Sequence, residues 1–78
     1  MPYRTITPGE KASSPASARA TLKVRNEESK TGKFSIKIGS GQTEQESITH
    51  GNKKEYDVKD KSFVLINKGD VDLEWLRD

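Results

Sequence analysis

Apolar residues alternate with polar ones over most of the chain, and this alternation is the feature that most limits its fold. Leu22 and Val24 alternate with polar neighbours, most of them charged, and Phe34 and Ile36 do the same in the next segment. A period of two is typical of strands that have one buried and one exposed face. From residue 19 onward no segment shows a helical period, and the spacing between turns is too short for a helix. The sequence therefore predicts an all-β fold.

The lengths of these segments narrow the architecture further. About six short strands, separated by polar or glycine-containing turns, are expected between residues 19 and 78. Short, closely spaced strands are typical of an antiparallel β-sandwich or a small barrel. The segment 48–51, with Tyr56 and Val58, resembles the strand–turn–strand corner common in immunoglobulin-like sandwiches. We expect a small antiparallel β-sandwich, immunoglobulin-like or jelly-roll-like, with a small β-barrel as the alternative.

The segment between the last two expected strands has the composition of a tight turn. Asn67 suits the first position of a type I turn, and Gly69 suits the positive φ of the bulge that follows such a turn. The sequence therefore predicts that these two strands form a hairpin.

Residues 1–18 differ from the rest of the chain. They contain all three prolines, and the apolar residues among them show no period. A segment of this kind buries too little apolar surface to offset the entropy lost on ordering. We expect a flexible N-terminal arm over residues 1–18 and a sandwich domain over residues 19–78.

Composition argues against several classes of function. The chain has no cysteine, which excludes a disulfide scaffold, a structural cysteine–zinc site and thiol catalysis. Its one histidine, His50, has no cysteine partner and no Gly-x-Ser-x-Gly motif to act with, so we expect no enzyme and no cofactor. No apolar stretch approaches the roughly 20 residues of a membrane span. Because no signal-peptide pattern is visible, a cytoplasmic location is the default expectation.

Three acidic residues, Asp70, Asp72 and Glu74, share one face of the last expected strand because alternate strand residues point to the same side. Carboxylate oxygens are ligands for calcium. Basic residues on the first two expected strands favour cross-strand pairing instead. We expect ion pairs and no metal site.

Positive charge is concentrated in the first half of the chain. Residues 1–39 carry eight basic and three acidic side chains, whereas residues 40–78 carry six basic and nine acidic ones. A basic patch that could meet phosphates is expected on the first two strands, at Lys23, Arg25, Lys33 and Lys37. The aromatic platform of a single-strand binder is missing from this half. Nucleic-acid binding is therefore an alternative function only.

Trp75, the one tryptophan, is in phase with Val71 and Leu73, which favours a place in the core. An exposed tryptophan would suit a sugar-stacking site or an interface. Carbohydrate binding is accordingly a second alternative function.

The segment Phe63–Ile66 has four apolar residues in succession, so it places two on each face of one strand. A strand of a two-layer sandwich should be polar on its outer side. Leu76, out of phase with Trp75, is expected to add to the outer apolar side. We therefore expect an interface at Phe63, Val64, Leu65, Ile66 and Leu76. The function predicted is a non-enzymatic protein-interaction or assembly module that binds another copy of itself or another protein.

Overall fold

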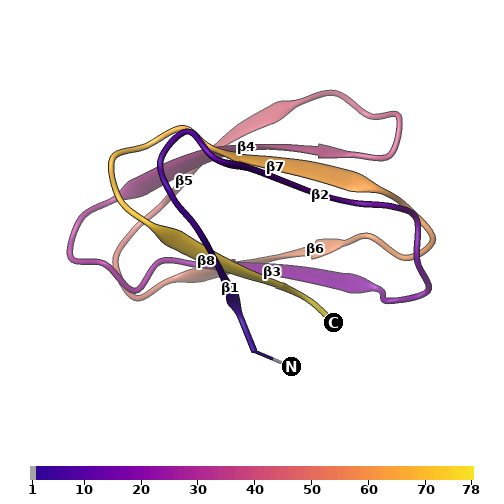
Figure 1. The fold of residues 1–78 in the computed structure, drawn as a ribbon, viewed down its shortest axis with the longest axis horizontal. Coiled ribbons are helices and arrows are strands. Elements are labelled where there is room, and N and C mark those ends of the chain that lie inside the picture. Colours follow the sequence, from indigo (N-terminus) through magenta and orange to yellow (C-terminus); the bar gives the residue numbers. More distant parts are fainter. Residues whose placement is uncertain (1) are drawn as a thin grey trace.

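The computed structural model describes residues 2–78, which form eight antiparallel strands in two sheets and no helix. The strands are β1 (Arg4–Ile6), β2 (Lys11–Ser14), β3 (Thr21–Arg25), β4 (Gly32–Ile38), β5 (Glu44–Ile48), β6 (Lys53–Asp57), β7 (Phe63–Asn67) and β8 (Leu73–Arg77). One sheet has the order β1-β8-β3-β6 and the other has the order β2-β7-β4-β5. The two sheets lie face to face as the layers of a sandwich (Figure 1). The predicted all-β sandwich is confirmed.

The connections between the strands define the type of sandwich. Within residues 2–78, β4 and β5 are the one pair of consecutive strands that are neighbours in a sheet. Every other connection among them crosses from one sheet to the other. Eight strands connected in this way form a jelly roll. The structure therefore has the jelly-roll order, in two separate sheets, and differs from the closed barrel that was the alternative.

The core lies between the sheets and follows the predicted alternation. Leu22 and Val24 of β3 and Phe34 of β4 are fully buried, whereas the charged residues between them point outward. The core residues are Ile6, Leu22, Val24, Phe34, Ile36, Ile48, Val58, Phe63, Leu65 and Leu73. Burying an aliphatic or aromatic side chain of this size stabilises a protein by about 1.5–3 kcal/mol. All six strands expected after residue 19 are present.

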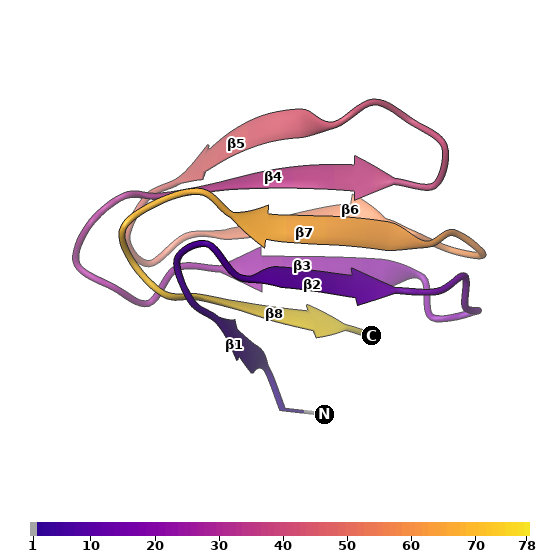
Figure 2. The ribbon, with the colours of Figure 1, turned by 45° about the horizontal axis from the view of Figure 1, so that its top comes forward.

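The N-terminal segment differs from the expected flexible arm over residues 1–18. β1 pairs with β8 and β2 pairs with β7, so each adds an edge strand to one sheet (Figure 2). Ile6 lies in the core with 1% of its surface exposed. Strands of three and four residues are too short to display a period of two, and Pro2, Pro8 and Pro15 all fall outside them. The sequence pattern therefore missed both strands.

The predicted hairpin between the last two strands is wrong, because β7 and β8 belong to different sheets. Asn67 is buried, and its side chain hydrogen-bonds to the backbone of the connection from β7 to β8. Its side-chain amide donates to the carbonyls of Ile6 and Val71, and its side-chain oxygen accepts from the Gly69 amide. A Cβ on Gly69 would come within 2.8 Å of the Lys33 backbone nitrogen. Glycine is required here by close packing and not by a positive φ.

Asn26 has the same role in the connection from β3 to β4. Its amide donates to the carbonyls of Lys30 and Ile48, and its side-chain oxygen accepts from the Glu28 amide. Asn26 and Asn67 are both 0% exposed. Two buried asparagines thus provide hydrogen-bond partners for backbone groups of two crossing loops at the same end of the sandwich. Such partners matter because a buried polar group without one lowers stability.

Arg77 organises the opposite end. Its guanidinium makes six hydrogen bonds, one to the Ser14 hydroxyl and five to backbone carbonyls in the segments 15–19 and 58–61. The side chain also lies over the Phe63 ring, 5.5 Å from its centroid. Only 7% of Arg77 is exposed, and no carboxylate within residues 2–78 pairs with it. Two loops far apart in sequence are therefore joined through one cation.

We expect Arg77→Met to lower the free energy of unfolding by at least about 3 kcal/mol, because hydrogen bonds to a charged group are strong and the buried carbonyls would lose their donors. Lys59→Met, an exposed change in the neighbouring loop, is the matched control. Urea denaturation of the two variants provides the measurement. Equal stabilities would show that the network does not hold this end of the sandwich together.

Ile6→Ala tests whether β1 is part of the folded unit. We expect it to cost about 2–5 kcal/mol in unfolding free energy, as other large-to-small changes in a core do. Thr5→Ala, at the exposed neighbouring position, should change that free energy by no more than about 0.5 kcal/mol. Thermal melts of both variants suffice, and a flexible arm would instead leave both midpoints unchanged.

Candidate binding surfaces

The four apolar residues of β7 divide between the two faces of their sheet. Phe63 and Leu65 point inward and are 1% and 0% exposed. Val64 and Ile66 point outward and are half-buried. The sequence left open which pair faces the core, and the structure assigns the outer role to Val64 and Ile66.

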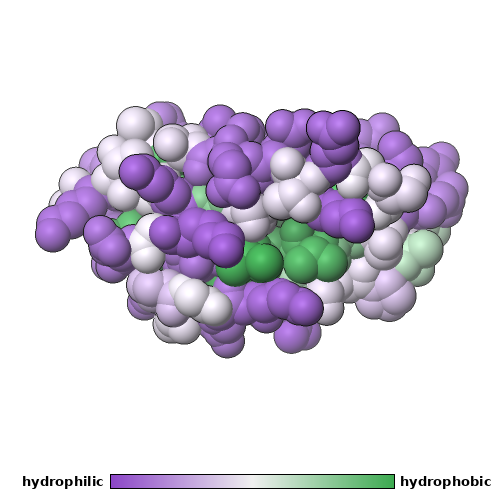
Figure 3. Space-filling view, turned by 90° about the horizontal axis from the view of Figure 1, so that it is seen from above, coloured by the Kyte–Doolittle hydropathy of each residue, from purple (hydrophilic) through white to green (hydrophobic). Residues whose placement is uncertain are grey.

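Lysines from the adjacent strands flank this outward pair. The register places Lys11 of β2 beside Ile66 and Lys37 of β4 beside Val64. Lys33 points to the same side of β4, four residues before Lys37. Figure 3 looks onto this sheet and shows a small hydrophobic spot surrounded by hydrophilic side chains. We call the surface formed by Val64, Ile66, Lys11, Lys33 and Lys37 the lysine face.

The lysines of this face are not neutralised by neighbours. Within residues 2–78, none of the three has an ion-pair partner. The outer face of the other sheet is different, because its cations are paired. Its shortest ion pairs are Arg25–Glu74 at 2.7 Å, Lys23–Asp78 at 3.3 Å and Lys53–Glu55 at 3.3 Å. The lysine face therefore has an excess of positive charge that the opposite face lacks.

The expected basic patch does not form one surface. Lys23 and Arg25 lie on β3, whereas Lys33 and Lys37 lie on β4, and these strands belong to different sheets. All four side chains point outward, so the two pairs face opposite sides of the molecule. Glu74 pairs with Arg25 across the sheet, and this hydrogen bond raises the pKa of Arg25. The predicted cross-strand pairing is confirmed for this acidic residue.

Leu76 also lies away from the predicted interface. It is half-buried on the outer face of the β1-β8-β3-β6 sheet, directly opposite Lys23. The expectation that it extends the apolar side of β7 is wrong because β8 and β7 are in different layers. Of the predicted interface residues, Phe63 and Leu65 are in the core, and only Val64 and Ile66 share an outer face.

Trp75 has the predicted inward phase but is only half-buried. Its ring packs edge-to-face on Phe63 with 5.6 Å between centroids, and Arg4 lies over it at 5.9 Å. β1 is too short to cover the ring fully. A groove of about 440 Å³ remains beside the Trp75 ring, and Arg19 also lines it. Sequence reasoning missed this groove because its walls come from the segment expected to be a flexible arm.

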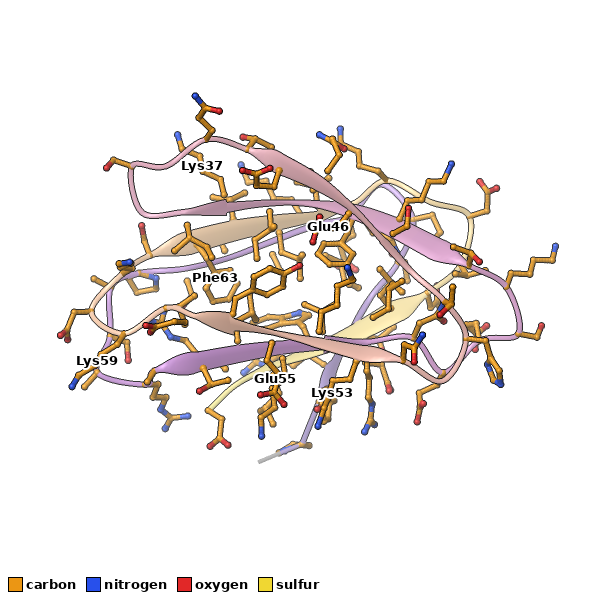
Figure 4. All side chains as sticks on the ribbon, turned by 180° about the vertical axis from the view of Figure 1, so that it is seen from behind. Lys37, Glu46, Lys53, Glu55, Lys59 and Phe63 are labelled. Carbon is orange, nitrogen blue, oxygen red and sulfur yellow. The ribbon has the colours of Figure 1, made fainter. Side chains whose placement is uncertain are left out.

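Polar side chains close the other open edge of the sandwich, between β5 and β6. The Tyr56 hydroxyl donates to Glu46 at 3.1 Å, and the Lys54 ammonium lies 3.5 Å from the same oxygen. Figure 4 shows Glu46 reaching between the two layers. Burial, and then the hydrogen bond to Glu46, raises the pKa of Tyr56. This arrangement places paired polar side chains over the edge, and it favours the protonated form of the phenol.

Two further candidates from the sequence lie apart from any cluster. His50 is exposed in a turn, where its ring contacts the carbonyl oxygen of Glu28. Asp70 and Asp72 are exposed before β8 begins. Within residues 2–78, no three histidine or acidic side chains gather in a way that could hold a metal ion. The same residues contain no helix able to cross a membrane.

Comparison with known proteins shows similarity in structure. No protein-family model and no curated protein matches the chain. Among solved structures, it is similar to a chain in the crystal structure of Drosophila melanogaster CENP-C bound to CAL1, with a TM-score of 0.60 and 18% sequence identity. The match covers 97% of this chain and 62% of that chain, so this protein spans less than two thirds of its length. At such an identity the similarity shows the fold alone.

Paired double variants test the division of β7. Phe63→Ser with Leu65→Ser should unfold the protein, because losing a large core side chain costs about 2–5 kcal/mol. Val64→Thr with Ile66→Thr should leave it folded, because threonine keeps the β-branched shape that suits a strand. Far-UV circular dichroism and thermal melts distinguish the two. Unfolding of the threonine variant would reverse the assignment of the faces.

Proposed function

We propose that this protein is a non-enzymatic protein-interaction module that binds an acidic partner protein through the lysine face. The observation that carries the proposal is an apolar centre surrounded by lysines without ion-pair partners within residues 2–78. Protein interfaces combine an apolar centre with a polar rim. Complementary charge guides the encounter and selects the partner.

The fold comparison adds support of a general kind. The solved structure to which the sandwich is similar is that of CENP-C bound to CAL1, a complex of two proteins. A chain of similar fold therefore occurs in a complex of two proteins. The acidic partner proposed here rests on the charge of the lysine face and not on that comparison.

Self-association through this face is the less favoured form of the interaction. Two copies that met face to face would oppose their lysines, and like charges brought together disfavour an interface. Half of the apolar run of β7 is already used in the core, so the outward apolar area is only that of Val64 and Ile66. A partner that supplies carboxylates would remove both difficulties.

Nucleic-acid binding has weaker support than protein binding. Phosphate contacts need clustered cations, but the expected basic patch divides between opposite faces. The cations of β3 are already paired with carboxylates. An apolar centre contributes nothing to phosphate recognition, whereas it suits the side chains of a protein.

The experiment is a titration of the isotope-labelled protein, followed by amide NMR, with a synthetic peptide of alternating glutamate and leucine. We expect shifts on the lysine face and an affinity at least about tenfold weaker when Lys11, Lys33 and Lys37 are all changed to Glu, since each reversed charge opposes the peptide. The charge-matched control changes Lys59, Lys61 and Lys68, three exposed loop lysines, to Glu.

Three results would contradict the proposal. Equal losses in both triple variants would indicate a response to net charge alone. Tighter binding of a single-stranded oligonucleotide than of the peptide would favour nucleic acid. A dimer in light scattering that Val64→Thr with Ile66→Thr dissolves would identify a second copy as the occupant of the face.

A further inference from the structure

The open edge between β1 and β2 contains a groove that is separate from the centre of the lysine face. Its walls include Arg4, Ser13, Ser17, Arg19 and Trp75. Its volume is about 440 Å³, within the range of small-molecule sites, which are roughly 300–1,000 Å³. A second hollow of about 280 Å³ shares Arg4, Ser13 and Trp75 with it. The two hollows therefore lie along one edge and suit an extended ligand.

The groove is positively charged. Arg4, Arg19 and Arg77 all line the larger hollow, and no carboxylate is among its described lining residues, whereas the second hollow is lined by both Glu10 and Lys11. Arg77 is buried below the surface, and its six hydrogen bonds are all made to neutral oxygens. Its charge is therefore not cancelled by an ion pair within residues 2–78. A cation in a poorly screened setting attracts an anion more strongly than one in water.

Trp75 supplies a flat surface held in one orientation. Phe63 meets its ring edge-to-face, at an interplanar angle of 81°, and this contact fixes the indole from the core side. Arg4 lies above the same ring. The ring is half-buried, so part of its surface remains available. Tryptophan combines a large apolar face with a polar edge, which suits ligands that have both characters.

We propose that this groove binds an acidic saccharide, and specifically a short chain of hexuronate units. The apolar face of one pyranose ring packs on the part of Trp75 that Arg4 and Phe63 leave exposed, and its carboxylate accepts hydrogen bonds from Arg4 and Arg19. The serine hydroxyls of the wall, Ser13 and Ser17, meet the sugar hydroxyls. A guanidinium is well suited to a carboxylate because its N–H groups match the two oxygens. The shared edge of the two hollows accommodates the next sugar unit.

The test uses the intrinsic fluorescence of Trp75, the only tryptophan in the chain. Trigalacturonate should bind saturably and change the emission, whereas the neutral trisaccharide galactotriose should bind at least about tenfold more weakly. Calorimetry on the same samples gives an independent affinity. Arg4→Gln should weaken the binding of trigalacturonate by about tenfold, since it removes a charge-assisted hydrogen bond. Arg4 is exposed, and a melt of the variant checks that it folds.

Lys37→Gln is the matched control, because it removes one positive charge from the lysine face and leaves the groove intact. It should leave trigalacturonate binding unchanged. Equal losses in the Arg4 and Lys37 variants would overturn the proposal, as would equal affinity for the neutral sugar or no saturable binding at millimolar concentration. Equal affinity for hexaglutamate or inorganic phosphate would also overturn it, by identifying a general anion site. None of these results depends on the lysine face binding a protein.

Discussion

The guanidinium of Arg77 connects two loops that otherwise meet through direct backbone hydrogen bonds, such as the one that the Asp60 amide donates to the Ser17 carbonyl. One loop follows β2 and the other follows β6, and their carbonyls converge on a single cation from the last strand. A lysine has three donors on a flexible stem, whereas arginine has five in a rigid plane, so only arginine can reach this many acceptors. The core residue Phe63 lies beneath it. The position of Trp75, and with it the groove, depends on this end of the sandwich being closed.

The other end uses neutral groups for the same purpose. Asn26 and Asn67 each span a crossing loop with two donated bonds and one accepted bond. The sandwich is thus held by apolar burial in the middle and by buried polar side chains at both ends. This division is economical for a chain of 78 residues without cysteine, because its core alone is thin. The outer face of the β2-β7-β4-β5 sheet then contributes little to the stability of the fold, and its lysines remain without ion pairs within the described residues.

The sequence predicts the strands and core residues that depend on local alternation. It does not predict which distant strands pair with one another. Strands such as β3 and β4 follow from the period of two, and so do core residues such as Leu22 and Phe34. Pairing between strands is a long-range property, so the separation of Lys23 from Lys33 and of Leu76 from Ile66 was not visible. The groove needs Ser14 and Arg77 side by side, although the two hydrogen-bonded residues are 63 positions apart in the sequence. No local sequence pattern predicts a contact between residues so far apart.

The strand order has a consequence for the moment at which the protein becomes structured. β8 lies between β1 and β3, and β7 lies between β2 and β4, so each sheet receives a central strand from the end of the chain. Until both have left the ribosome, the pairs β3–β6 and β4–β5 are all that either sheet can assemble from residues 2–62. Structures that rest on distant pairings form late and slowly. Both sheets therefore stay incomplete until residues 63–77 are available to pair, and β7 and β8 complete them together.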